Sequence, residues 1–416
     1  MSKVDAIRWF VGRQARNTRA LLAEGIRLFP PLAGATLDVD DVRVVREALA
    51  RRDDWAEGST TARFEEEFSR WNGSRHAAAF LGGRVALSAC VYALGLRPGD
   101  EVILPGYTCV VVANAFRFAG VVPVFADIEL ETYGLDAGSA ARRITPRTRA
   151  LLLHHLYGLV CRDYEALLDL ARRHGLPVIE DCAQATGAVW QGEKVGNRGE
   201  MGFYSFEESK VMTTILGGMA VTGDDRLAAR LREYQERAPT PAPERVESIL
   251  RTALLDYYQL KHPKRWFFGD VAHLLHGKQR IVSTSQEEEQ GTRPADYGQR
   301  MPSPIAALGR NQLAKVDRYN ELRRQAALRW DRWCDEGGYR RPVVLEGSVP
   351  VFLRYPVMVS PEMKRDLSWA ESSLGVSPGV WFTSPLHPAP SVVDDCPNAD
   401  EAVRRCVNFP CLPGGT

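Results

Sequence analysis

The fold class can be read from two short apolar runs, Arg149-Ala-Leu-Leu-Leu-His-His155 and Leu176-Pro-Val-Ile-Glu-Asp181. Between them lies a helical segment that we expect to begin at Asp163, a suitable N-cap, and to stop at Gly175. Continuous apolar strands that alternate with helices are typical of a mostly parallel sheet covered on both faces. The sequence therefore predicts an α/β fold.

The same alternation extends from about Ala77 to Thr222. Further strands are predicted at Glu101–Pro105, Val121–Asp127, Met201–Phe206 and Gly218–Thr222. In such sheets ligands bind at the carboxyl ends of the strands. Asp181 and Lys210 both lie at or just after such ends, so we expect a functional site there.

The chain divides into three predicted regions. An N-terminal segment and a large domain occupy residues 1–235, a helical and loop connector occupies residues 236–300, and a smaller C-terminal α/β domain occupies residues 301–416. A long helix from about Ser303 to Cys334 is expected to open the last region. The chain stops at Pro413-Gly-Gly-Thr416, before a last expected helix, so we expect a truncated chain or a short variant.

Composition narrows the class of protein. The 416 residues are 45% hydrophobic and 25% charged with a net charge of +1, which is typical of a soluble globular protein and gives no broad electrostatic footprint for nucleic acid. No apolar run reaches the roughly 18 residues that a membrane span needs. Residues 1–31 mix arginines with apolar residues and lack an apolar signal core, so we expect a helix that packs on the protein, on a second subunit or at a membrane surface.

The eight cysteines are scattered and form no C-x-x-C pair, which predicts reduced thiols and a cytoplasmic location. Cys406 and Cys411 lie close together near the end of the chain. Because no His or Cys partner stands at ligand spacing, no metal site is expected.

Lys210 is the most informative single residue. It ends the stretch Gly202-Phe-Tyr-Ser-Phe-Glu-Glu-Ser-Lys210, in a chain that has 53 basic residues but only eight lysines. A Lys amine can lose its proton and form an imine with an aldehyde, whereas Arg stays protonated. The alternative is an ordinary surface lysine.

An imine-forming cofactor such as pyridoxal phosphate also needs a carboxylate against its pyridinium nitrogen and donors at a helix start for its phosphate. Asp181 could supply the carboxylate, although it could equally cap the next segment. The turn Gly82-Gly83-Arg84 could supply the phosphate site, although a glycine pair is often only a turn. Ser205 is a second phosphate candidate.

These residues resemble the DegT/StrS-type sugar aminotransferases, fold-type I enzymes that depend on pyridoxal phosphate. The resemblance covers roughly residues 39–312 as an ordered set, with a fainter echo at Pro385-Leu-His387 and at Asn408-Phe-Pro410 near the end of the chain. The matching stretches are Phe64–Phe68, Arg97–Pro105, Ala119–Asp127, Ile144–Thr148, His155–Gly158, His174–Gln184, Ser205–Lys210, Gly217-Gly218 and Arg300-Met301.

The resemblance implies a large domain with a mostly parallel sheet, a smaller C-terminal domain and a homodimer. It also implies roles: Lys210 holds the internal aldimine and moves the proton, and Asp181 pairs with the pyridinium N–H. Gln184 hydrogen-bonds the phenolic oxygen. Ser205 and Gly82-Gly83-Arg84 bind phosphate.

Other positions carry weaker implications. Tyr107, His155 and Arg300 are expected in the substrate pocket. Cys109 stands where the family usually places an aromatic ring over the cofactor, Gly82-Gly83-Arg84 replaces Ser-Gly-Thr, and Gly298 replaces an asparagine expected from the partner subunit. A thiol packs against a ring but stacks less well than an aromatic side chain.

By resemblance, the expected activity is transfer of an amino group from glutamate or glutamine to a keto-sugar, nucleotide-linked by analogy, through a pyridoxamine phosphate form and ping-pong kinetics. A dehydratase or other lyase on a related scaffold is an alternative, but such sugar dehydratases carry His where this chain has Lys210. A catalytically degenerate, cofactor-binding regulator is a second alternative.

One further stretch, Lys261-His-Pro-Lys-Arg-Trp-Phe-Phe268, combines basic and aromatic residues. It could contact a nucleotide diphosphate, a lipid-linked acceptor or a membrane surface. The alternative is a linker helix that packs on the dimer.

Overall fold

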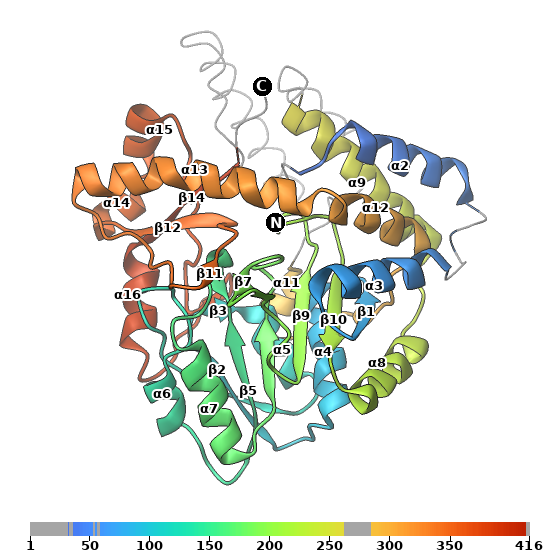
Figure 1. The fold of residues 1–416 in the computed structure, drawn as a ribbon, viewed down its shortest axis with the longest axis horizontal. Helices are drawn as coiled ribbons and strands as arrows, with labels where there is room; N and C mark the ends of the chain where they lie inside the picture. The colour runs from blue at the N-terminus through green and yellow to red at the C-terminus, as the bar shows by residue number, and fades with distance from the viewer. Residues whose placement is uncertain (1–31, 33–35, 53–54, 56–58, 262–283, 413–416) are drawn as a thin grey trace.

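A computed structural model describes residue 32, residues 36–52, residue 55, residues 59–261 and residues 284–412 (Figure 1). Its centre is a seven-stranded sheet in the order β1-β10-β9-β6-β5-β2-β4. Strand β10 pairs antiparallel with both β1 and β9, and the remaining neighbours pair in parallel. The strands are β1 (His76–Phe80), β2 (Glu101–Pro105), β4 (Val122–Ala126), β5 (Thr148–His154), β6 (Val178–Asp181), β9 (Met201–Ser205) and β10 (Gly218–Thr222).

Helices cover both faces of this sheet (Figure 1), which confirms the predicted α/β class. One face packs against α4 (Gly83–Leu94), α5 (Val110–Arg117) and α8 (Asp225–Arg237), and the other against α3 (Ser59–Asn72), α7 (Tyr164–His174) and α12 (Ser303–Leu313). Successive strand residues point to opposite faces. In β5, Leu151 and Leu153 belong to one apolar core, whereas Ala150 and Leu152 belong to the other.

The predicted strands lie within one or two residues of the observed ones, because most of them are buried apolar runs between turn residues; the edge strand β4 is partly exposed. Helix α7 begins after Asp163 and ends at Gly175, whose φ of 63° is the left-handed conformation that glycine adopts easily. The Asp163 side chain does not cap its own helix; it accepts hydrogen bonds from Ala137 N–H and Arg162.

The prediction of one long helix from Ser303 to Cys334 is wrong. The segment forms α12 and then α13 (Val316–Gly337), with a break at Ala314 and Lys315. Lys315 leaves the helical region with a φ of −124°, and its ammonium group pairs with Asp40 and Asp41. The break also turns the chain from the sheet toward the C-terminal region (Figure 1).

The C-terminal region packs around β12 (Arg354–Met358) and β14 (Cys406–Pro410), which pair antiparallel. The helices α14 (Pro361–Arg365), α15 (Ser368–Leu374) and α16 (Pro397–Arg405) surround this pair, and α13 crosses it. The α13 residue Trp330 stacks on Phe409 with ring centroids 4.4 Å apart and donates a hydrogen bond to the Pro410 carbonyl. The two terminal strands are therefore fixed to α13.

The predicted connector contains α9 (Pro243–Lys261), which packs on α2 (Val39–Ala50), and the short α11 (Gln286–Glu289). The α11 segment returns to the large domain: Asn114 donates a 2.6 Å hydrogen bond to the Glu288 carbonyl, and Tyr297 hydrogen-bonds Ser88. The three region boundaries stay a prediction.

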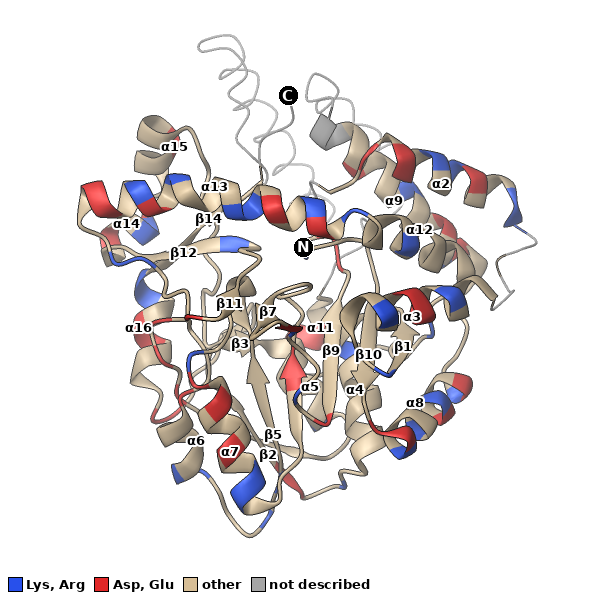
Figure 2. Cartoon of the chain, in the orientation of Figure 1, with Lys and Arg blue, Asp and Glu red and all other residues tan. Residues whose placement is uncertain are grey.

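Several expectations fall on residues outside the described ones: the helix at residues 1–31, residues 262–268 of the basic and aromatic stretch, and the chain end at residues 413–416. On the outer helices α2, α8 and α13, basic and acidic residues are interspersed (Figure 2). Within the described ranges, none of the helices has the length and apolar character to cross a membrane.

Candidate active site

A cavity of about 310 Å³ opens at the carboxyl ends of β5, β6 and β9, on the face that α4 and α5 cover. This volume is at the lower end of the range for small-molecule pockets. Its walls include every residue that the sequence assigned to the cofactor: Gly82, Gly83, Arg84, Cys109, Asp181, Gln184, Ser205 and Lys210. The fold thus brings them together, while their individual roles remain predictions.

The start of α4 forms one end of the cavity. The helix begins at Gly83 with Gly82 before it, and no side chain caps it. The first backbone N–H groups of a helix have no partner within the helix, so those of Gly83 and Arg84 are available to an anion. A Cβ on Gly83 would lie 2.7 Å from Ser205 Cβ, so only glycine lets the helix start approach Ser205 this closely.

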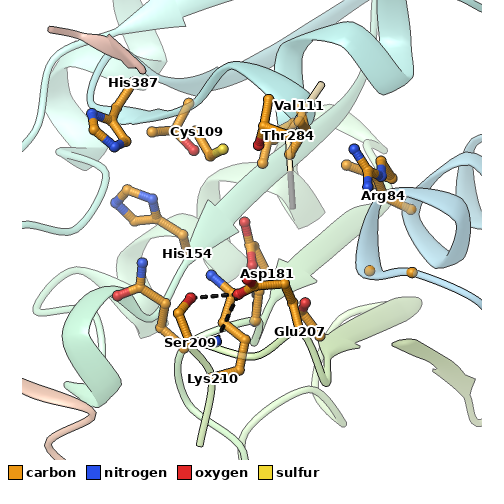
Figure 3. Close-up of a pocket in the computed structure, with 18 of the residues that line it drawn as sticks. Arg84, Cys109, Val111, His154, Asp181, Glu207, Ser209, Lys210, Thr284 and His387 are labelled. Carbon is orange, nitrogen blue, oxygen red and sulfur yellow. Dashed lines mark hydrogen bonds between the residues drawn. The ribbon is translucent and has the colours of Figure 1, made fainter. Parts of the chain in front are cut away.

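Arg84 lies at the edge of the cavity (Figure 3), and its side chain reaches Glu288 in α11. Its guanidinium pairs with the carboxylate of Glu288, which is 2% exposed. The sequence did not reveal this partner, because it lies about 200 residues away. Thr284 and Glu289, on either side of Glu288, also line the cavity.

Asp181 and Lys210 lie close together in the centre of the site (Figure 3). Asp181 ends β6 and accepts a 2.9 Å hydrogen bond from Ala183 N–H. Burial raises the pKa of Asp181 to about 6, against the opposing effects of this hydrogen bond and of the Lys210 charge. A carboxylate held in this way favours a cationic or N–H partner in the cavity.

Lys210 follows β9 in a loop that folds back on itself, with Thr214 N–H bonded to the Phe206 carbonyl. Its Nζ lies 5.1 Å from the centroid of the Trp381 ring. Trp381 comes from a loop of the C-terminal region and lines the same cavity. No sequence motif pointed to Trp381, so an aromatic neighbour of the lysine was missed.

Gln184 and Cys109 both line the cavity. The side-chain oxygen of Gln184 accepts a 2.9 Å hydrogen bond from Tyr157 N–H, which leaves its amide N–H groups for a ligand oxygen. Cys109 ends the short strand β3 (Thr108–Cys109), which pairs with β13 (Leu386–His387). Burial raises the pKa of the Cys109 thiol, so it remains a neutral packing group.

His387 stands beside Cys109 in this pairing and also lines the cavity (Figure 3). Burial, together with the charges of Arg354 and Lys210, lowers the pKa of His387 to about 4. The sequence held a faint signal for this residue in the stretch Pro385-Leu-His387.

The histidine that ends β5, His154, and the one that follows it, His155, point to different places. The His155 ring hydrogen-bonds Glu180 at 3.2 Å on the far side of the sheet. His155 still lines part of the cavity, and its role in substrate binding stays a prediction. The His154 ring stands in the cavity (Figure 3), in register with Asp181. Its Nε2 lies 2.8 Å from the Tyr133 carbonyl, and its Nδ1 has no partner among the described residues. Burial lowers the pKa of His154 to about 4.

The other two predicted substrate residues lie outside the cavity wall. The Tyr107 hydroxyl is fully buried and bonds Tyr157, the Trp381 carbonyl and Phe382 N–H, so it supports the loop that carries Trp381. Arg300 bonds the Thr240 hydroxyl, while its backbone lies beside the end of β1. Their substrate roles stay predictions.

His155, Glu180 and Cys182 form a group with metal-ligand spacing. The Glu180 oxygens, however, already accept hydrogen bonds from Tyr164 and from three backbone N–H groups, those of Gly196, Arg198 and Gly199. Burial raises the pKa of the Cys182 thiol well above its usual value. The group is therefore better described as the anchor of β6 than as a metal site.

The residues present fit pyridoxal phosphate. Open N–H groups and the Ser205 hydroxyl at the start of α4 suit a phosphate, the carboxylate of Asp181 suits a pyridinium N–H, and the Gln184 amide suits a phenolic oxygen. Lys210 supplies an amine for an aldehyde. Each group lines one continuous cavity.

Comparisons with known proteins agree with this fit. Residues 36–416 match the model of the DegT/DnrJ/EryC1/StrS aminotransferase family. The GDP-perosamine synthase of Caulobacter vibrioides is 42% identical over 184 residues, which are 44% of this chain and 49% of that protein. The L-glutamine:2-deoxy-scyllo-inosose aminotransferase of Streptomyces kanamyceticus is 35% identical over 68% of this chain and 58% of that protein. The chain thus spans about half the length of these first curated relatives.

Two matches extend over most of both chains. The dTDP-4-dehydro-2,3,6-trideoxy-D-glucose 4-aminotransferase of Saccharopolyspora spinosa is 30% identical over 93% of this chain and 92% of that protein. The X-ray structure of S. venezuelae DesV in complex with a ketimine intermediate superposes with a TM-score of 0.67 at 27% identity, over 90% of this chain and 89% of that one.

Proposed function

Because the chain belongs to the DegT/DnrJ/EryC1/StrS aminotransferase family, we propose that it is an aminotransferase that acts on a keto-sugar. In its finer form, the proposal names glutamate or glutamine as the donor and a nucleotide-linked keto-sugar as the acceptor. The observation that carries it is the convergence of Lys210 and the buried Asp181 on one cavity, whose far end is the uncapped start of α4.

Pyridoxal phosphate, the cofactor of this family, supplies an aldehyde that bonds amines and a ring that withdraws electrons. Asp181 would hold a proton on the ring nitrogen, and Gln184 would orient the ring through its amide N–H. Ser205 and the N–H groups of Gly83 and Arg84 would bind the phosphate. Lys210 Nζ would take the proton from the α-carbon of the donor and would deliver it to C4′, the aldehyde carbon of the cofactor.

The experiment is spectroscopic. Purified protein with added pyridoxal phosphate should show a visible band that glutamine or glutamate bleaches and that a keto acceptor restores. Lys210→Ala should bind the cofactor without covalent attachment, so borohydride should not fix it to the chain. Absence of any band would sink the proposal, and a band that no donor bleaches would point to a lyase or a regulator.

The acceptor is open to a direct screen. A panel of nucleotide-linked keto-sugars and a keto-cyclitol, the substrate type in the name of one relative, can be tested in an assay coupled to consumption of the donor. Faster turnover of the cyclitol than of every sugar nucleotide would reject the nucleotide-linked acceptor.

The proposal includes a cytoplasmic homodimer. Its support is the family resemblance and the eight cysteines, which are all unpaired. Light scattering on the purified protein gives the oligomeric state, and a monomer that transfers amino groups would reject the dimer.

A further inference from the structure

Arg354 is a buried cation that the proposed function leaves unused and that shares an aromatic neighbour with the reactive lysine. It begins β12, and it is 5% exposed. Its Cζ lies 3.3 Å from the centroid of the Trp381 ring, and Lys210 Nζ lies 5.1 Å from the same centroid. One indole of the cavity wall therefore contacts both cations.

Within the described part of the chain, the Arg354 guanidinium has neither an ion-pair partner nor a hydrogen bond, and its Nε is buried without a partner. Burial lowers the pKa of Arg354 to about 10, so the group is still charged at neutral pH. An unpaired buried charge is costly, and such groups are usually paired or bound to a ligand.

The backbone packs closely around Arg354, and the carboxylate whose charge acts on it is bound elsewhere. A Cβ on Gly379 would lie 2.8 Å from Nη1, so the backbone there approaches closely only because the residue is glycine. Glu207, a carboxylate whose charge acts on Arg354 without forming an ion pair with it, already accepts hydrogen bonds from the backbone and hydroxyl of Ser209. The indole covers a face of the guanidinium, and the N–H edge is the part that binds carboxylates.

Arg323 shows what a structural arginine looks like in this protein. It is 1% exposed, and burial lowers its pKa to about 10, as for Arg354. Its two terminal nitrogens, however, donate to the Asn320 side chain at 3.0 Å and to the Val211 carbonyl at 2.7 Å. Burial alone therefore does not explain why Arg354 lacks partners.

We propose that Arg354 binds the α-carboxylate of the amino donor. This inference rests on the proposed function, which brings the donor's amino group to the Lys210 position. In an α-amino acid a single carbon separates the amine from the carboxylate, and Arg354 and Lys210 share contact with one indole ring. A carboxylate at the guanidinium edge supplies the missing counter-ion.

The first test compares donor binding by the holoenzyme. The variants are Arg354→Met, Arg354→Lys as the conservative change, and Arg323→Met as the matched buried control. We expect Arg354→Met to raise the glutamine concentration for half-maximal bleaching by about 10- to 100-fold, the loss expected for charge-assisted hydrogen bonds. Arg354→Lys should recover part of this loss, and Arg323→Met should leave it within about 2-fold.

Donor analogues locate the effect on the carboxylate. Glutaminol carries a hydroxymethyl group in place of the carboxylate, so the wild type should prefer glutamine and Arg354→Met should lose that preference. An effect of Arg354→Met on the half-saturation of the acceptor alone would overturn the assignment to the donor.

The second test needs no turnover. Glutarate should raise the melting temperature of the wild-type holoenzyme and should not raise that of Arg354→Met. Without ligand, Arg354→Met should melt at or above the wild-type temperature, because an unpaired buried charge is removed, whereas Arg323→Met should melt lower.

These readouts separate the two proposals. If no donor bleaches the wild type, the proposed function fails, and the glutarate comparison still decides whether Arg354 binds a carboxylate. Unchanged glutarate binding combined with a lower melting temperature of Arg354→Met would make Arg354 a structural cation and overturn the inference.

Discussion

Asp181→Asn should make the cofactor-free protein more stable at neutral pH. The wild-type carboxyl is 7% exposed, has one hydrogen bond from Ala183 N–H and carries a pKa raised to about 6 by burial. The charge is therefore unfavourable in the folded protein until a cationic partner occupies the cavity. Asparagine has nearly the same shape and carries no charge.

The magnitude follows from the pKa of Asp181. Its ordinary value is 3.8 and its value in the fold is about 6, and each unit corresponds to about 1.4 kcal/mol. Because the folded state binds the proton more tightly than the unfolded state, its stability falls as the pH rises from about 4 to about 6 and then stays level. Above pH 7, Asp181→Asn should exceed the wild type in unfolding free energy by about 2 kcal/mol relative to their difference at pH 4, because part of the effect is already present at pH 4.

The assay is urea unfolding of cofactor-free wild type and variant at several pH values between 4 and 8, read as the difference between the two curves. Glu180→Gln is the matched control, one residue away. Burial alone would raise the pKa of Glu180, but hydrogen bonds from His155, Tyr164 and Gly199 lower it on balance. That variant should be less stable than the wild type at neutral pH, and the deficit should shrink as the pH falls. Parallel pH curves for wild type and Asp181→Asn would refute the reasoning.

Two further predictions concern the ends of the cavity. Gly83→Ala places a Cβ 2.7 Å from Ser205 Cβ and should weaken binding of pyridoxal phosphate by at least about 10-fold in a fluorescence titration. The control is Gly223→Ala, where a Cβ meets nothing within 4 Å, and it should leave binding unchanged. Equal affinities of the two variants would contradict the close approach of Gly83 to Ser205. Glu288→Gln removes the charge that pairs with Arg84 in a site where Glu288 is 2% exposed and should lower the unfolding free energy by about 3 kcal/mol in urea, a loss that Glu289→Gln should not reproduce.

The sequence predicts the sheet well because the strands are buried on both faces. In β5 the run Ala150–Leu153 is apolar and buried on both faces, and the helix that follows carries its own stop at Gly175. The break between α12 and α13 has no such signal. It depends on the distant carboxylates Asp40 and Asp41, which draw Lys315 out of the helical conformation.

The site residues also fall into two groups, those that the local sequence predicts and those that depend on distant packing. Residues that follow strand ends, such as Asp181 and Lys210, were predictable because parallel strands align their carboxyl ends. The choice between His154 and His155 was not, because it depends on which face of β5 lies beside α4. That face is set by the register of His154 with Asp181. Trp381 could not be predicted either, since its loop reaches the cavity only through the packing of Tyr107 and Tyr157 on its backbone.

Arg323 and Arg354 show that sequence cannot distinguish a structural buried arginine from one that binds a ligand. Both are arginines within apolar surroundings, both are buried, and burial shifts the pKa of each to about 10. Nε is buried without a partner in both, but their terminal nitrogens differ: those of Arg323 reach Asn320 and the Val211 carbonyl, whereas those of Arg354 reach no acceptor among the described residues and its guanidinium lies against the Trp381 ring. Neither sequence pattern nor burial separates a guanidinium that completes the fold from one that awaits an anion. The number of hydrogen bonds that each guanidinium makes does separate the two. An unpaired buried charge is costly to the folded protein, and a bound anion would offset that cost at Arg354.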